Sequence, residues 1–361
     1  MKVSTSLIPQ LPIRLTSALC AILFLSVAPV VVAGVTPPPN YVVEDLGALP
    51  GDVTSVASGI NASGDVVGWS TSKYGSRAFL YSDGAGMVEL PALGEGDSRA
   101  RDINDSREIV GTSAAIKGLK GRAVLWVDGK VNDLGTLQGG GGSDAWAINN
   151  SGQIVGSVAV GDFIASEHAF LYEQATGMVD LTPDLHQAVA LDINDAGEIT
   201  GYCDASDGSQ HAFYWLAKEL VDLGELPGFG FSSGAALNEK GLVVGTATSP
   251  GSKQAHMFSV DTVTSMKDLN GKLGVAFALA VNSAGDVVGY VPGVTTTRAI
   301  LYTQAAGVRD LNTLISQPKL WTIEGATDIN DAGVIVGYAY NAKSRQSHAV
   351  RLRPAFAPFP G

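Results

Sequence analysis

Cysteine and charged side chains are scarce in this chain of 361 residues. The two cysteines are Cys20 and Cys203, and Cys20 lies in an apolar N-terminal stretch that we expect to be removed. A single remaining cysteine excludes an intrachain disulfide and a cysteine-ligated metal site. Charged residues make up 16% of the chain and hydrophobic residues 45%, so we expect a folded protein with a substantial core.

Cations are in the minority as well, because 35 acidic residues oppose 23 Lys and Arg residues and the formal net charge is −12. Such a surface repels phosphate backbones, so we expect no nucleic-acid partner. The glycine run at residues 139–142 lacks the Lys-Ser/Thr of a phosphate-binding loop, and no nucleophile elbow, zinc-binding helix or spaced carboxylate pair stands out. The sequence therefore predicts no cofactor, no metal and no catalytic residues.

The N-terminus predicts an exported protein. Lys2 and Arg14 precede an almost wholly apolar segment, and small residues lead to a cleavage point after Ala33. This pattern is typical of a cleaved signal peptide over residues 1–33, followed by a Pro-rich linker over residues 34–40. The alternative is an uncleaved anchor, because about 20 apolar residues can span a bilayer. We expect a secreted, extracellular protein without stable membrane insertion after signal removal; the periplasm is the alternative location.

One segment recurs seven times after the linker. Each copy has an apolar residue, an asparagine, a short polar turn and a β-branched run that ends in glycine. Each repeat also has a segment that begins with Arg or His and a short segment that carries an acid, so it offers four short strands bounded by turn residues. The repeat asparagines lie 43 to 48 residues apart, and they are Asn61, Asn104, Asn149, Asn194, Asn238, Asn282 and Asn330.

A period of about 40–45 residues with four strands is typical of a propeller blade. The sequence predicts an all-β fold: a seven-bladed β-propeller of four-stranded blades over residues 41–353, a tail over residues 354–361, and no helix after the signal. A β-solenoid is the alternative. Ala or Gly stands four residues before each asparagine, so space is short there and we place this strand innermost. The other order, with the acid-bearing strand innermost, stays open.

The last repeat lacks its fourth strand, and residues 41–46 offer one ahead of the first repeat. We therefore expect Tyr41–Leu46 to pair antiparallel with His348–Arg353 and to close the ring, which removes two open sheet edges. The register of the outer hairpin places a cation beside an acid in every repeat. The predicted pairs are Arg77–Glu89, Arg122–Asp133, His168–Asp180, His211–Asp222, His256–Asp268, Arg298–Asp310 and His348–Asp45.

The Arg/His-Ala-Phe pattern adds a resemblance to a family. The segments His168-Ala169-Phe170-Leu171-Tyr172 and Asp133-Leu134-Gly135-Thr136-Leu137, together with the Ile-Asn turn, resemble the extracellular HAF repeat family of bacteria. The resemblance covers about residues 41–353 and implies export and a repeated β architecture. It brings no catalytic residues, because the family has no established activity to carry over.

Positions that vary between the repeats are the candidates for function. If the innermost strand lines a channel, one of the two positions that lie two and three residues before the asparagine faces it. The polar or aromatic residues there are the ones that a ligand could contact. Packing between blades is their alternative role. The candidates are Arg101, Asp102, Trp146, Asp192 and Asp328.

Histidines and acids that recur in every repeat indicate architecture, whereas a catalytic residue would be singular. We therefore expect a secreted, non-enzymatic binding or structural repeat protein with an unidentified glycan or protein ligand. The alternative is an extracellular propeller enzyme, a polysaccharide hydrolase or lyase with its site at the channel mouth. Converging acids, or a histidine with an acid, in one axial pocket would favour the enzyme, and scattered aromatic side chains on a shallow face would favour a binding module.

Overall fold

The structure is a computed structural model that describes residues 41–355 except 162–165, 250, 252–253 and 262–264. The predicted signal peptide, the linker and residues 356–361 of the predicted tail lie outside the described residues. Where the structure describes the chain, no helix is long and apolar enough to cross a membrane. The expectation of no helix is wrong at one point, the 3-10 helix η1 (Leu311–Thr313), which forms because the Asp310 carboxylate accepts the N–H of Asn312 and caps the turn.

Each repeat contributes an inner hairpin, and we number the repeats 1 to 7 by their asparagines. The first strands end just before the asparagine and are β2 (Thr54–Ile60), β6 (Ser98–Ile103), β10 (Gly140–Ile148), β14 (Ala188–Ile193), β18 (Phe231–Leu237), β22 (Phe277–Val281) and β26 (Trp321–Ile329). The second strands follow the turn and are β3 (Val66–Ser72), β7 (Ile109–Ser113), β11 (Ile154–Val160), β15 (Ile199–Asp204), β19 (Val243–Thr248), β23 (Val287–Val291) and β27 (Ile335–Asn341).

The third and fourth strands form the outer hairpin. The third strands are β4 (Gly75–Ser82), β8 (Arg122–Val127), β12 (Ser166–Glu173), β16 (Gln210–Leu216), β20 (Ala255–Val260), β24 (Arg298–Thr303) and β28 (Gln346–Pro354). The fourth strands are β5 (Gly86–Glu89), β9 (Lys130–Asp133), β13 (Gly177–Asp180), β17 (Glu219–Asp222), β21 (Lys267–Asp268), β25 (Gly307–Asp310) and, for repeat 7, β1 (Tyr41–Gly47).

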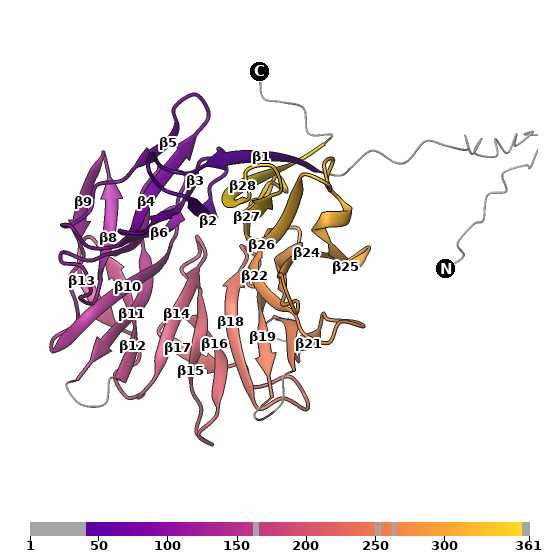
Figure 1. Ribbon diagram of the computed structural model, residues 1–361. Coiled ribbons are helices and arrows are strands. Elements are labelled where there is room, and N and C mark those ends of the chain that lie inside the picture. The colour runs from indigo at the N-terminus through magenta and orange to yellow at the C-terminus, as the bar shows by residue number, and fades with distance from the viewer. Residues whose placement is uncertain (1–40, 162–165, 250, 252–253, 262–264, 356–361) are drawn as a thin grey trace, which may run out of the picture. The chain divides into compact units, whose positions relative to one another are not determined.

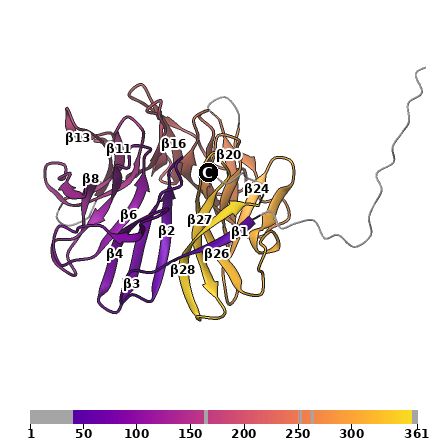
Figure 2. The ribbon, with the colours of Figure 1, turned by 90° about the horizontal axis from the view of Figure 1, so that it is seen from above.

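The strands of each repeat pair antiparallel in this order, as in the sheet β2-β3-β4-β5. Repeats 4 and 5 share one eight-stranded sheet, because Gln210 of β16 pairs in parallel with Phe231 of β18. In repeat 7 the N-terminal strand β1 completes the sheet beside the C-terminal strand β28, and Val42 lies opposite Arg353. This is the predicted pairing, and Figures 1 and 2 show the two strands side by side.

The repeat asparagine closes its own turn and reaches the next repeat. The Oδ1 of Asn149 accepts the backbone N–H groups of Ser151 and Gln153, at 3.1 and 2.9 Å. Its Nδ2 donates to the carbonyl oxygen of Asn194, at 3.0 Å. The equivalent Nδ2 bond joins every repeat to the next, repeat 7 to repeat 1 included, at 3.0 to 3.5 Å. These bonds make a closed circuit of seven amides.

The turn after each asparagine needs a residue with positive φ, and Gly197 supplies it at 78° in repeat 4. Arg107 occupies the place in repeat 2 and adopts a φ of 64°, which a residue with a Cβ rarely does. Its guanidinium reaches back to the buried Asp65 of repeat 1, with bonds of 2.7 and 3.0 Å. This ion pair explains how the turn keeps its shape without glycine.

Hydrophobic clusters fill the junctions between neighbouring repeats. Between repeats 1 and 2, Ala78 packs with Ala100 and Trp126. The junction between repeats 7 and 1 is filled in the same way, since Val336 and Ala349 pack with Ala57, Leu46 and their neighbours. Each of the seven junctions has one such cluster. Apolar burial therefore continues around the whole series of repeats.

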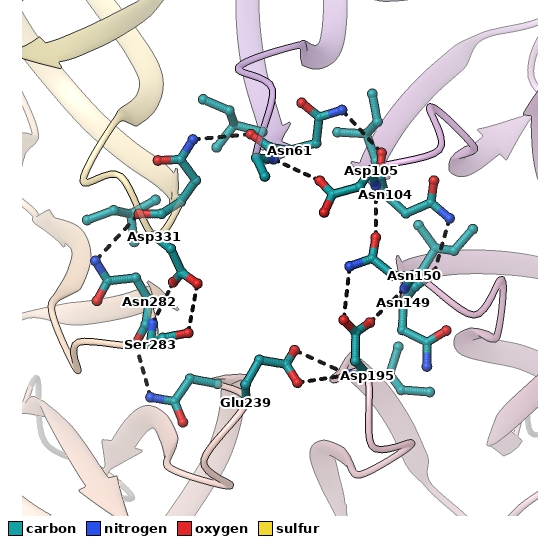
Figure 3. A pocket seen from close by; sticks show the side chains of 18 of the residues that line it. Asn61, Asn104, Asp105, Asn149, Asn150, Asp195, Glu239, Asn282, Ser283 and Asp331 are labelled. Carbon is teal, nitrogen blue, oxygen red and sulfur yellow. Dashed lines mark hydrogen bonds between the residues drawn. The ribbon is translucent and has the colours of Figure 1, made fainter. Parts of the chain in front are cut away.

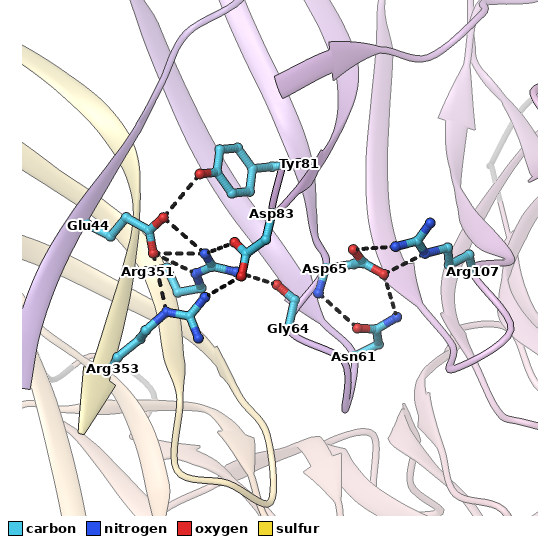
Figure 4. A network of polar contacts seen from close by, with 9 residues as sticks. All are labelled: Glu44, Asn61, Gly64, Asp65, Tyr81, Asp83, Arg107, Arg351 and Arg353. Atoms are coloured by element: carbon cyan, nitrogen blue, oxygen red, sulfur yellow. Dashed lines mark hydrogen bonds and ion pairs between the residues drawn. The ribbon is translucent and has the colours of Figure 1, made fainter. Parts of the chain in front are cut away.

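A buried arginine joins the two ends of the described chain to repeat 1 (Figure 4). The side chain of Arg351 in β28 is 1% exposed, and its Nε and Nη2 donate to the Glu44 carboxylate of β1 at 2.9 and 3.0 Å. It also donates to the carbonyl of Gly64 at 2.6 Å and to the Asp83 carboxylate. These hydrogen bonds lower the pKa of the Asp83 carboxyl. No pattern in the sequence distinguishes Arg351 from the other arginines.

The seven predicted cation–acid pairs are confirmed. His348 and Asp45, which are 303 residues apart in sequence, lie 2.9 Å apart from Nδ1 to Oδ1. The other pairs lie on the outer hairpins, and each of their acids remains partly exposed. They support the architecture of the outer hairpin, and none faces the central cavities described below.

We predict that Arg351→Leu lowers the free energy of unfolding by about 2–3 kcal/mol, because several hydrogen bonds to charged groups are lost at a buried site. Urea denaturation measures the change. Arg353→Leu is the matched control, because Arg353 contacts the same two acids with a 26% exposed side chain. We expect the control to cost at most about 1 kcal/mol. Equal losses in the two variants would show that burial of Arg351 adds nothing.

We also predict that Asn149→Asp destabilises the protein by about 2–3 kcal/mol. The carboxylate keeps the two acceptor contacts but places an oxygen against the Asn194 carbonyl and the Gln153 side chain, to which Nδ2 now donates. Thermal and urea unfolding measure the effect. Asn132→Asp makes the same change at an exposed residue whose Nδ2 donates to the Leu125 carbonyl, and we expect a change within about 0.5 kcal/mol. A similarly small loss at Asn149 would contradict the importance of the circuit.

Candidate functional site

The first strands of all seven repeats converge on two cavities, which places this strand innermost as predicted. The turn cavity, of about 220 Å³, is lined by the residues of the asparagine turns of every repeat. The strand cavity, of about 380 Å³, is lined by first-strand residues of every repeat. Its volume lies in the range of small-molecule sites.

The five predicted ligand-contacting residues all line the strand cavity; they are Arg101, Asp102, Trp146, Asp192 and Asp328. Whether they bind a ligand stays a prediction. The expectation that only one of the two varying positions faces the cavity is wrong, because adjacent residues such as Arg101 and Asp102 both line it. Every first strand has a β-bulge at this place, as between Ala100 and Asp102. A bulge breaks the alternation of side chains between the two faces.

Close approach at the bulge also explains the glycine of the second strand. A Cβ at Gly68 would collide with the carbonyl oxygen of Val56 and lie 3.0 Å from the Phe79 ring. The same collision with a first-strand carbonyl would occur at the equivalent glycine of the other repeats. The Ala or Gly four residues before each asparagine lies at this contact, which confirms that space there is short.

The three aspartates join neighbouring repeats through backbone N–H groups. Asp102 accepts from Ile103 of its own repeat at 2.7 Å and from Ile148 of the next at 2.9 Å. Asp192 likewise accepts the N–H groups of Ile193 and Leu237. Asp328 serves Ile329 and, across the junction with repeat 1, Ile60. The three carboxylates thus accept N–H groups from six of the seven repeats. The alternative role, packing between blades, holds for these acids.

Burial in the wall of the strand cavity perturbs these acids. Desolvation raises the pKa of Asp192 from 3.8 to about 8, against the two backbone hydrogen bonds, which lower it. Desolvation raises the pKa of Asp328 to about 7, and the Asp102 charge adds to that rise. The pKa of Asp102 is raised by burial as well. All three side chains keep some surface toward the cavity, but the surrounding protein still disfavours their charged forms.

Arg101 contributes a cation to the same wall. Its guanidinium lies over the Trp146 ring, 4.0 Å from the ring centre, and 5.9 Å from the centre of the Trp69 ring. Its Nε is buried without a hydrogen-bonding partner, and so is Nε1 of Trp146. Burial lowers the pKa of Arg101, and the nearby Asp144 opposes that shift. Within the described residues, cation–π contact is the main interaction of this guanidinium.

Trp69 was missed by the sequence reasoning, which looked for channel residues in the first strand alone. It belongs to β3 and follows Gly68, at a place where the other repeats have Thr, Ser or Tyr. Trp is the bulkiest aromatic at that position, and this was the available signal. On the side of repeats 5 and 6 the wall is apolar, and it is formed there by Ala235, Ala236, Leu279 and Ala280.

A second ring of hydrogen bonds joins the residues that line the turn cavity (Figure 3). The residue after each asparagine donates its N–H to the corresponding side chain of the next repeat at several junctions, as from Asp105 to Asn150 and from Asn150 to Asp195. Burial raises the pKa of Glu239, and the neighbouring acids Asp195 and Asp331 add to that rise. In the described part of the chain, no group of three His, Cys, Asp or Glu residues is arranged to hold a metal ion.

Three acids, Asp102, Asp192 and Asp328, line the strand cavity together, which is the arrangement expected of an enzyme, whereas Trp69 and Trp146 supply the aromatic side chains expected of a binding module. Neither cavity is lined by a histidine. Each strand-cavity carboxylate accepts two backbone N–H groups and so has a structural role. The pKa values of about 8 for Asp192 and about 7 for Asp328 still let these two acids exchange protons near neutral pH. Cys203 is buried elsewhere, and desolvation raises its pKa to about 12, which disfavours the thiolate that a nucleophile requires.

The raised pKa values predict a pH dependence of stability. An acid with a raised pKa in the folded protein stays protonated while the unfolded chain, with a pKa of about 3.9, is ionised. The contribution of Asp192 to the free energy of unfolding should therefore fall as pH rises from about 4 to about 8. Asp192→Asn should flatten the profile measured by urea unfolding between pH 5 and 8. Asp184→Asn, which removes an exposed carboxyl, controls for net charge. An unchanged slope in Asp192→Asn would mean that this carboxyl is ionised throughout the range.

No protein-family model and no curated protein matches this chain. Solved structures do resemble it. One is that of prolyl endopeptidases, with a TM-score of 0.56 and 12% identity over 85% of this chain and 51% of that one. Another is an oligogalacturonate lyase from Vibrio parahaemolyticus, with a TM-score of 0.52 and 10% identity over 86% of this chain and 93% of that one. A third is a puromycin-hydrolyzing peptidase of Mycobacterium tuberculosis, with a TM-score of 0.51 and 11% identity over 90% of this chain and 57% of that one.

The chain spans about half the length of the prolyl endopeptidase structure that it resembles. At 10 to 12% identity these likenesses concern the fold and carry no activity over to this chain. Together with the four-stranded antiparallel sheets, they show that the described chain has a β-propeller fold.

Proposed function

We propose that the chain is a seven-bladed propeller whose ring is closed by the N-terminal strand. The amide circuit of the seven repeat asparagines supports this, because it returns from Asn330 to the carbonyl of Asn61 at 3.1 Å. The apolar cluster between repeats 7 and 1 and the pairing of β1 with β28 support it as well. Each blade is then one repeat, and the two cavities lie along the axis.

We further propose that the protein is secreted and that its repeats belong to the extracellular HAF type. The apolar segment at residues 15–33 and the small residues before Gly34 support cleavage of a signal peptide. A fold whose described part contains one buried free cysteine is compatible with an oxidising compartment, since no disulfide has to form.

The function that the site supports best is non-enzymatic binding of a ligand in the strand cavity. One observation carries this proposal: the cavity combines an apolar and aromatic wall with carboxylates that are already bonded to backbone N–H groups. Both oxygens of each wall carboxylate already accept a backbone N–H, which favours a structural role over proton transfer to a substrate. A binding site needs shape, apolar surface and a few oriented polar groups, all of which line this cavity.

The experiment is a glycan array and a protein-ligand screen with the purified secreted protein, repeated with Ala235→Phe. Ala235 is half-buried and lines the strand cavity, so a phenyl ring there fills the space that a ligand would occupy. We expect the variant to lose the ligand, with at least about a tenfold weaker affinity, while its melting temperature changes little. Ala305→Phe, on the exposed outer turn of repeat 6, is the control and should bind normally.

Turnover of a bound polysaccharide by the wild-type protein would contradict the proposal and favour the enzyme. A ligand whose affinity is the same for wild type and Ala235→Phe would place the binding surface outside the strand cavity.

A further inference from the structure

The strand cavity is polarised across the axis. Arg101 and Trp146 come from repeats 2 and 3. The apolar residues Ala235, Leu279 and Ala280 come from repeats 5 and 6, which lie across the proposed ring from repeats 2 and 3. One side therefore presents a cation on an aromatic face, and the other presents small apolar side chains. A ligand that matches both sides needs an anionic end and an apolar body.

The Arg101 cation has no hydrogen-bonded counter-ion, although Asp144 lies near enough to raise its pKa. The Arg101 guanidinium forms no hydrogen bond or ion pair with another described residue, and its Nε is buried without an acceptor. Nε1 of Trp146, whose ring lies against the guanidinium, is also buried without an acceptor. Buried donors without acceptors are rare and cost free energy. The guanidinium lines the strand cavity with no acceptor among the described residues, so an acceptor with two oxygens in the cavity would be stabilised beside it.

A carboxylate fits this place best. A guanidinium presents its N–H groups as a planar fork that matches the two oxygens of a carboxylate, and stacking on an indole holds that plane in a fixed orientation. The polar side chains of Ser58 and Thr327 elsewhere in the wall already donate to backbone carbonyls, so they do not compete for the anion.

We propose that the strand cavity binds an organic carboxylate, with the Arg101 guanidinium on its carboxylate group and the apolar wall of repeats 5 and 6 around its body. The inference rests on the proposed function, because it names the class of ligand for the same cavity. Trp146 and Trp69 orient the guanidinium and do not need to touch the ligand.

The acids of the wall set a pH dependence for this binding. Asp102, Asp192 and Asp328 face the same cavity, and Asp144 lies near the guanidinium together with the like-charged Arg99. While the three wall acids are protonated, Arg101 dominates the charge of the cavity. Ionisation of the acids at higher pH adds negative charge that repels an anion. Carboxylate binding should therefore be tighter at pH 6 than at pH 9.

The test is calorimetric titration of the purified protein with benzoate, glucuronate and the neutral benzamide, at pH 6 and pH 9. Benzoate and glucuronate separate an aromatic acid from a sugar acid, and benzamide has the shape of benzoate without its charge. We expect at least one carboxylate to bind, benzamide to bind more weakly, and Arg101→Met to weaken the carboxylate about 10- to 100-fold. Arg101→Lys, which keeps the charge and loses the planar fork, should recover only part of the affinity.

Melting curves establish that the Arg101 variants are folded, and Ala235→Phe gives an independent test at the opposite wall. Benzoate and benzamide binding with equal affinity, or a carboxylate affinity unchanged in Arg101→Met, would overturn the inference and leave cavity binding in place. If none of the carboxylates binds while a glycan from the array still requires Ala235, the ligand is neutral and the inference fails alone. If Ala235→Phe has no effect on any ligand, the proposed function fails with it.

Discussion

The asparagine that begins each inner turn is the group on which the arrangement of the repeats depends. Its carbonyl oxygen holds the turn of its own repeat, and its amide nitrogen donates to the backbone of the next, as Asn149 does toward Asn194. One side chain thus fixes a local turn and the distance to a neighbour. Six of the seven asparagines are buried, so the bonds lie where water competes little with them.

The β-bulge just before that asparagine lets two adjacent side chains of one strand line the strand cavity. A regular strand would send adjacent side chains to opposite faces, and only one of each pair would reach the axis. With the bulge, Arg101 and Asp102 both line the strand cavity. The N–H groups of Ile148, Leu237 and Ile60, at the ends of these strands just after the bulge, are accepted across repeat junctions by Asp102, Asp192 and Asp328. The same two positions of the first strand therefore face the cavity and hold neighbouring repeats together. The aspartates at these positions stabilise the junctions between repeats.

Junctions between repeats are not equivalent. Repeat 6 has Ala280 where repeats 2, 4 and 7 have aspartate, and its asparagine makes the longest bond of the amide circuit, 3.5 Å from Asn282 to Asn330. The junction is supported instead by Ser283, which donates both its N–H and its hydroxyl to Asp331. At the junction of repeats 7 and 1, the buried Arg351 adds ion pairs to the repeated contacts. Ion pairs thus reinforce the junction where the two ends of the described chain meet.

The sequence by itself determined the repeat, its four strands, the pairing of the first strand with the last and the seven cation–acid pairs, because all of these follow from local spacing and from the two-residue period of strands. It also selected five residues that line one cavity. Tertiary structure alone decided that both varying positions face the axis, that the aspartates are bound by backbone N–H groups, and that Arg101 lies unpaired on Trp146 with Trp69 nearby. These depend on a bulge and on contacts between repeats about 45 residues apart, which no local pattern specifies.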